Sequence, residues 1–177
     1  LLLDPVISVR QKQFEVIAAA GISGLGDATL AVWPRVQELD ARQRLPLVEM
    51  CLPALKSMSR QQYRVFKNTL LALIRADRQP ELYECCLFQL LRHYLDPEFF
   101  RVRSPRPRHR KLAQVSKQLR IVLSVLAYHG HDDPALAFNA AVNSLDLNDM
   151  TIAPSQSCNV ATFSRAVNEL NDCYPLL

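Results

Sequence analysis

The stretch that decides the fold runs from Ser59 to Leu95 and reads SRQQYRVFKNTLLALIRADRQPELYECCLFQLLRHYL. Each half repeats apolar residues at the spacing of a helix face. Ser59 and Gln62 have the spacing of a capping box, in which each side chain satisfies a backbone N–H of the other residue. Pro80 suits the first turn of a second helix, where its missing N–H would be unpaired anyway. The stretch therefore predicts a helical hairpin over residues 59–95.

The sequence on either side of this hairpin predicts more helices. Asp4 and Asp133 each precede a proline, as is typical of a helix start, and Gly21 and Gly130 follow helical patterns that they would end. We expect an all-α fold, an irregular helical bundle of about seven to eight helices around the central hairpin. We also expect residues 1–177 to form a single helical domain, because this length is that of one ordinary domain or at most two small ones.

The first residues, the apolar runs and the cysteines indicate what kind of protein this chain belongs to. The sequence begins with three leucines and no methionine, which favours a fragment of a longer protein over a signal peptide. No apolar run approaches the length that spans a bilayer. The five cysteines form no CxxC pair, so we expect reduced, packed thiols.

Positive charge is concentrated in a single segment. Residues 101–111 contain six cations and no acid. The charge of this segment exceeds the net charge of the whole chain, +4, so the rest of the chain is slightly acidic. Prolines at positions 97, 105 and 107 predict that residues 96–110 form a basic loop inside the domain. The candidate residues for binding an anion or a partner are Arg101, Arg103, Arg106, Arg108, Arg110 and Lys111.

Three interpretations of this basic segment stay open. The first is a solvated loop whose preceding aromatic residues, Phe99 and Phe100, pack back on the core. The second is a surface for an anionic protein or an anionic membrane. The third, less favoured, is a nucleic-acid site in which the cations bind phosphates and the two phenylalanines stack on bases.

Two turns contain possible metal ligands, but a simpler interpretation is favoured at both. His129 to Asp133 reads HGHDD, which also fits a helix end followed by the cap of the next helix. The second turn contains Asp77, Glu81 and Glu84. It also fits a helix end followed by acids near the N-terminus of the next helix, where the helix dipole favours negative charge. We find no serine or cysteine nucleophile with a base in reach. We therefore assign no catalytic residue, no cofactor and no metal to this chain.

A family resemblance adds to this interpretation. The segments LLLDPVISVRQKQ, RLPLVEMCLPALKSMSRQQYRVFKNTLLALIRAD, ELYECCLFQLLRHYLDP and PRPRH span most of residues 1–145. In this order they resemble the helical region that follows the catalytic domain of bacterial HtpX-like membrane zinc metallopeptidases. The zinc motif of that family, HExxH, is absent here, because none of His93, His109, His129 and His131 has the required spacing.

The resemblance implies a non-catalytic accessory or regulatory domain of a membrane protein. Its partner would be another protein or the protease domain of the parent, with an anionic membrane surface as a further candidate and nucleic acid less favoured. The resemblance also implies a location on the cytoplasmic side of the bacterial inner membrane. A second, fainter element, from Ala76 and Asp77 to Glu84, resembles the TerB-type helical domains and implies a cation-binding turn, although Arg78 stands where that family has glycine.

Overall fold

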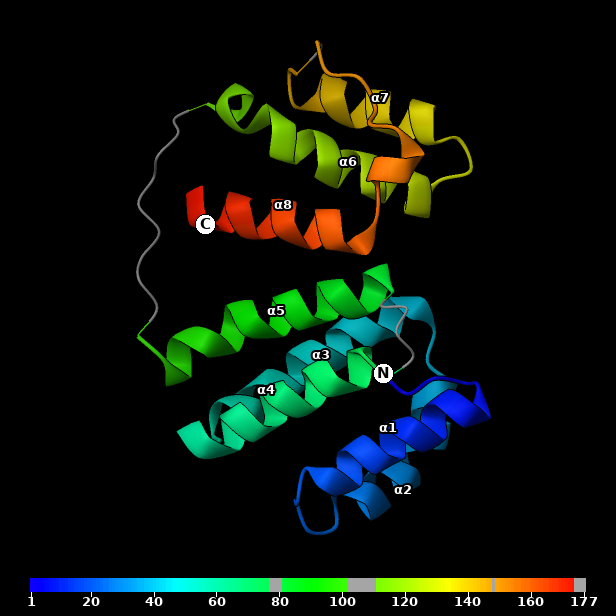
Figure 1. Cartoon of the computed structure of the whole chain (residues 1–177), viewed down its shortest axis with the longest axis vertical. Helices are drawn as coiled ribbons and strands as arrows, with labels where there is room; N and C mark the ends of the chain where they lie inside the picture. The colour runs from blue at the N-terminus through cyan, green and yellow to red at the C-terminus, as the bar shows by residue number, and fades with distance from the viewer. Residues whose placement is uncertain (77–80, 102–110, 148, 174–177) are drawn as a thin grey trace. The chain divides into compact units, whose positions relative to one another are not determined.

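The computed structural model is all-α, which confirms the predicted fold class. It describes residues 1–76, 81–101, 111–147 and 149–173, and within these residues it contains no strand. Eight helices follow one another along the described chain (Figure 1), with two short 3-10 turns, Leu112–Val115 and Ser155–Ser157. The helices are α1 (Ile7–Ala19), α2 (Leu25–Gln37), α3 (Ala41–Lys56), α4 (Arg60–Ile74), α5 (Leu82–Phe99), α6 (Ser116–Gly130), α7 (Pro134–Ser144) and α8 (Val160–Cys173).

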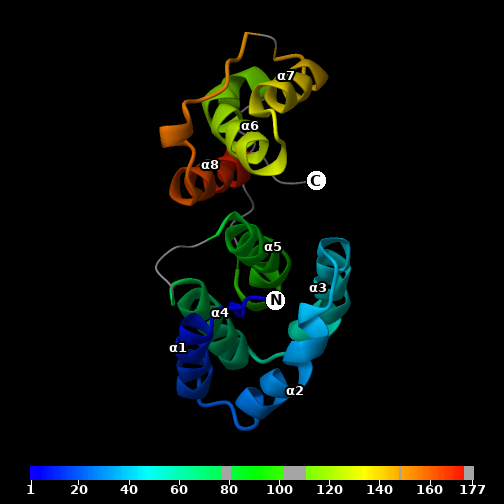
Figure 2. The same ribbon diagram turned by 90° about the vertical axis from the view of Figure 1, so that its right-hand side faces the viewer.

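The chain divides into two compact units, Leu1–Val102 and Arg103–Leu177, here called unit 1 and unit 2. Each unit is built from its own helices, α1 to α5 in the first and α6 to α8 in the second (Figure 2). The predicted basic segment falls where the chain passes from one unit to the next. The expectation of a single domain over residues 1–177 stays a prediction, because each unit is described by itself.

The predicted hairpin is the centre of unit 1. Helix α5 packs against both α3 and α4, and α4 also packs against α1. Buried side chains recur every fourth residue along α5, which places them on one face of the helix. With two residues from α3 and α4, they form the main core of the unit: Val48, Tyr63, Leu87, Leu91, Leu95 and Phe99. This apolar burial is the main source of stability for the hairpin.

Hydrogen bonds at the helix ends explain where the helices of unit 1 begin. The predicted capping box of α4 is confirmed: the Ser59 N–H donates to Oε1 of Gln62 at 2.7 Å, and the Gln62 N–H donates to Oγ of Ser59 at 3.2 Å. Helix α2 begins without a side-chain cap. Its N-cap is Gly24, whose φ of 74° is a conformation that glycine adopts without strain, and Asp27 lies inside the first turn.

Helix α5 extends further than predicted. Pro97 was expected to end the helix before the loop of residues 96–110, but the helix continues to Phe99 with Pro97 inside it. A proline costs a helix one hydrogen bond. Tertiary contacts offset that cost here, because Phe99 is buried against Tyr63 and because the carboxylate of Asp96 is bound by α4. The predicted loop is therefore wrong for residues 96–99, and residues 102–110 lie outside the described residues.

Unit 2 has a core of its own around α6. Helix α6 packs against α7 and α8, and the core residues Ala127, Phe138 and Val142 come from α6 and α7. The predicted cap of α7 is confirmed, since Oδ1 of Asp133 accepts the N–H of Leu136 at 3.0 Å. The hydroxyl of buried Ser124 accepts the N–H of Ala153 at 2.9 Å and thereby fixes the loop before α8.

An extended segment before α1 completes the packing of unit 1. Gln13, on α1, is 2% exposed. Its side-chain amide donates to the carbonyl of Leu2 at 2.7 Å and accepts the N–H of Asp4 at 2.8 Å. Both polar ends of a buried amide are thus satisfied, which is what burial of such a group requires. These two bonds hold the segment Leu1–Asp4 in place, and this segment lines the pocket described below.

Candidate functional site

The predicted basic segment is only partly described. Arg101 and Lys111 are both exposed, the first in unit 1 and the second in unit 2. Arg103, Arg106, Arg108 and Arg110 lie outside the described residues. The proposed joint role of these six cations therefore stays a prediction.

The two phenylalanines before that segment pack on the core of unit 1. Phe99 is buried, and its ring stacks on Tyr63 with 4.4 Å between the centroids. Phe100 is half-buried, with the cations of Arg64 and Lys67 over its ring at 5.9 and 5.6 Å. Because Phe99 has no free face of useful size, this packing argues against base stacking by this residue and agrees with the first of the three interpretations.

A cluster of charges joins the end of α5 to α4. The hydroxyl of Tyr63 and the ammonium of Lys67 both donate to Oδ1 of Asp96, at 2.7 and 2.5 Å, and Nε of Arg92 lies 3.4 Å from Oδ2. Burial raises the pKa of Asp96, but the hydrogen bonds from Lys67, Tyr63 and Arg92 and the positive charge of Lys67 together lower it by more, so that the net shift is downward. The pKa of Tyr63 is raised, first by burial and then by its bond to Asp96. Every charge in this cluster has a partner, so the cluster is structural in character.

The two turns with possible metal ligands show helix caps where they are described. Asp133 caps α7, and its N–H donates to Nδ1 of His131 at 2.9 Å. Glu81 and Glu84 form a capping box at the start of α5. Asp77 lies outside the described residues, so the TerB-like ligand set stays a prediction. Across the described stretches, no three histidine, cysteine or acidic side chains come together as metal ligands would.

The cysteines are less packed than their sequence context suggested. Cys51 and Cys86 are exposed, whereas Cys85 and Cys158 are half-buried. The buried face of α5 runs through Leu87 and Leu91 and leaves Cys86 at the surface. Partial burial of its sulfur nevertheless raises the pKa of the Cys86 thiol, with a further contribution from Cys85.

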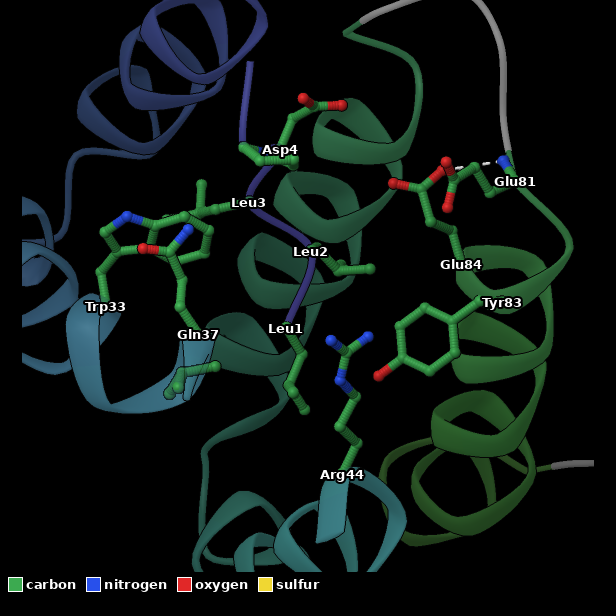
Figure 3. A pocket seen from close by; sticks show the side chains of 12 residues that line it. Leu1, Leu2, Leu3, Asp4, Trp33, Gln37, Arg44, Glu81, Tyr83 and Glu84 are labelled. Carbon is green, nitrogen blue, oxygen red and sulfur yellow. Dashed lines mark hydrogen bonds between the residues drawn. The ribbon is translucent and has the colours of Figure 1, made fainter. Parts of the chain in front are cut away.

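A pocket of about 320 Å³ lies in unit 1, where α2, α3 and the first turn of α5 face the segment Leu1–Pro5. Figure 3 shows this segment crossing the pocket, with Trp33 and Gln37 to one side and Arg44, Tyr83 and Glu84 to the other. Sequence reasoning missed this site, since its residues come from four separate parts of the chain and share no motif.

Arg44 is the distinctive residue of the pocket. Its guanidinium lies over the ring of Tyr83, 5.7 Å from the centroid, as in a cation–π pair. Its Nε atom is buried and has no hydrogen-bond partner, and among the described residues no carboxylate lies within ion-pair distance of it. Burial raises the pKa of Tyr83, while the positive charge of Arg44 opposes that shift.

The opposite wall of the pocket is aromatic and held in place. Trp33 of α2 lines it, and the guanidinium of Arg10 lies 5.6 Å from the centroid of the indole ring. Arg10 in turn donates to the carbonyl of Pro5 at 2.9 Å, so the tryptophan, the arginine and the segment Leu1–Pro5 are linked. The lining of the pocket thus combines the cation of Arg44 and three acids, Asp4, Glu81 and Glu84, with apolar side chains.

Comparison with family models, with curated proteins and with solved structures gave no match for this chain. In the part of the chain that the structure describes, the helices are too short or too polar for any of them to cross a bilayer.

Proposed function

We propose that this chain is a non-catalytic helical module that binds a protein partner, and that this partner is the protease domain of a membrane zinc metallopeptidase to which the module is appended. The observation that carries the proposal is the exposure of α2. Its sequence, LGDATLAVWPRVQ, is mostly apolar, yet none of its residues is buried. Leu30 is 55% exposed and Val32 is 54% exposed.

An apolar helix without buried side chains is characteristic of a surface that another protein covers. In a folded unit, the apolar face of a helix normally faces the core. Helix α2 packs against α1, and its residues Leu25, Trp33 and Val36 are half-buried, but Leu30 and Val32 stay in solvent. Other exposed apolar residues of unit 1 come from the start of α1, the turn after it and α3: Val6, Ile7, Ile22, Leu45 and Met50. Large exposed apolar surface on a folded unit marks sites of protein–protein interaction.

The resemblance to the region that follows the protease domain of HtpX-like peptidases supports the choice of partner. It implies that the module would act on the cytoplasmic side of the bacterial inner membrane, where it would regulate or present substrates to the protease. No residue of this chain is assigned a role in peptide-bond cleavage.

The test uses a longer gene product that contains both the protease domain and this module. We expect deletion of residues 1–177 to change the substrate range or turnover, and the double substitution Leu30→Asp with Val32→Asp to weaken co-purification of the separated module with the protease domain. A matched control is Leu136→Asp in unit 2, which is also exposed, at 61%. If the double variant and the control bind the protease domain equally well, α2 is not the docking surface. If deletion leaves proteolysis unchanged, the accessory role is excluded.

A further inference from the structure

Three exposed arginines lie where α4 begins and α5 ends. Arg60 and Arg64 are four residues apart on α4 and share one face of that helix. Phe100, which follows α5, has the guanidinium of Arg64 over its ring at 5.9 Å, and Arg101 is the next residue in the chain. All three arginines are exposed, and they are called the arginine patch here. We propose that the arginine patch binds an acidic helical segment of a partner protein.

The acids beside the arginine patch do not neutralise it. The two carboxylates at the end of α5 are already paired, Asp96 with Lys67 and Arg92, and Glu98 with Lys56 at 2.7 Å. Among the residues that the structure describes, no carboxylate lies within ion-pair distance of any arginine of the patch. Helix α4 itself contains no acid. The positive charge of the patch is therefore open to an anion from another molecule.

The surroundings of the patch favour a protein partner over a membrane or a nucleic acid. None of the large exposed apolar residues in the described part of unit 1 lies on α4, so the patch lacks the apolar face with which a basic helix stays on a membrane. The rings beside it have no free face for a base, because Phe99 is buried and Phe100 lies under the cations of Arg64 and Lys67. Arginine is enriched at protein–protein interfaces, and its fork of N–H donors matches the two oxygens of a carboxylate.

The spacing of the patch matches that of acids on a helix. Arg60 and Arg64 are separated by about 6 Å along the axis of α4, and two glutamates four residues apart on another helix have the same separation. A partner helix that lies along α4 can thus offer one carboxylate to each arginine. Arg64 is held over the ring of Phe100, so less side-chain entropy is lost when a carboxylate binds to it.

This surface shares no residue with α2, and its test does not use the protease, so it fails or succeeds independently of the proposed function. The full chain is titrated, by calorimetry at about 50 mM salt, with an alanine-rich peptide of about 20 residues that has a glutamate at every fourth position. The matched peptide has glutamine at the same positions. We expect the glutamate peptide to bind at least about tenfold more tightly, because only a carboxylate forms a charge-assisted pair with arginine.

Two double substitutions separate the arginine patch from positive charge in general. Arg60→Gln with Arg64→Gln should weaken binding of the glutamate peptide by at least about tenfold. Arg35→Gln with Arg42→Gln removes the same charge from exposed arginines of α2 and α3, and should change the affinity by less than about twofold. The comparison of the two peptides is made on the unsubstituted chain, so it stands even if a variant fails to fold.

Each result decides between defined alternatives. Equal binding of the two peptides, or no binding of either, overturns the proposal. Equal effects of the two double substitutions also overturn it, because the peptide is then bound elsewhere, for example by the basic segment of residues 101–111. If a peptide with the same glutamates in one contiguous block binds as tightly, the patch reads charge alone and the helical spacing is wrong.

A membrane and a nucleic acid are tested in the same way. The probes are vesicles of phosphatidylcholine with one third phosphatidylglycerol, and a short DNA duplex. We expect neither to bind more weakly to the Arg60→Gln, Arg64→Gln variant than to the Arg35→Gln, Arg42→Gln variant. If either probe binds the unsubstituted chain more tightly than the glutamate peptide does, and loses that binding only in the first variant, the patch is a site for phosphates and the assignment to an acidic protein segment is overturned.

Discussion

Two regions of unit 1 place a cation over an aromatic ring, and they differ in what surrounds the cation. At the end of α5, Lys67 lies 5.8 Å from the centroid of Tyr63, and both residues donate to the carboxylate of Asp96. At the start of α5, Arg44 lies over Tyr83, and its Nε has no hydrogen-bond partner. The first region is a closed network that stabilises the fold. The second leaves a buried donor without a partner, so it is expected to stabilise the fold less than the first.

The closed network at the end of α5 is compared most strongly with the exposed helix α2 by truncating one apolar side chain in each. Leu95 is completely buried beside the Tyr63 cluster, and Leu30 is half exposed on α2. We expect Leu95→Ala to lower the free energy of unfolding of unit 1 by about 3 kcal/mol, because it removes buried area and leaves a cavity. Leu30→Ala should change it by less than about 0.5 kcal/mol. Urea unfolding monitored by Trp33 fluorescence measures both, and similar values would show that α2 is better packed than its exposure indicates.

A smaller effect is expected when the carboxylate of the closed cluster loses its charge. Asp96→Asn should lower the free energy of unfolding by about 2 kcal/mol at pH 7, because hydrogen bonds to a charged group are weakened. The exposed carboxylate of Glu49 on α3 supplies the control, since Glu49→Gln in the same unit should have little effect.

The Asp96→Asn variant also tests how the free energy of unfolding depends on pH. The pKa of Asp96 in the folded protein is below its ordinary value of 3.8. Folding therefore favours the ionised form, and its contribution is complete above about pH 4 and is lost as the pH falls through the lower pKa of the folded state. Unfolding free energies at pH 7 and pH 3 should thus differ less for Asp96→Asn than for the unsubstituted chain. An equal difference in both proteins would show that the negative charge of Asp96 does not stabilise the folded state.

The smallest effect is expected from the arginine of the pocket. Arg44→Met removes a cation–π contact with Tyr83, worth roughly 0.5–1 kcal/mol, and also removes a buried donor that has no partner. These contributions oppose each other, so we expect a change within about 0.5 kcal/mol. The matched variant is Arg92→Met, which also loses a ring contact, to Phe88, but in addition loses its bond to Asp96, and should cost about 1 kcal/mol. If Arg44→Met costs more than Arg92→Met, the pocket arginine is structural.

Local sequence signals predicted the helix starts well where a side chain decides them. Ser59 with Gln62, and Asp133 before Pro134, set their helices through hydrogen bonds within the same turn, so neighbours in sequence are enough. The predictions failed where distant residues decide. Pro97 stays in a helix because Asp96 and Phe99 on either side of it contact Tyr63, and Asp96 is 33 residues from Tyr63 in the chain. No local pattern predicts such contacts.

The sequence alone determined that this protein is helical, where the helices capped by Ser59 and Asp133 begin and that positive charge gathers between residues 101 and 111, because helical periodicity, capping and charge are properties of adjacent residues. The tertiary structure decided which helix face is buried and that α2 stays exposed. It also brought Trp33, Arg44, Tyr83 and the segment Leu1–Pro5 around one pocket. That outcome depends on which helices pack together, and packing is a sum of many weak contacts between residues distant in the chain, none of which has a signature of its own in the sequence.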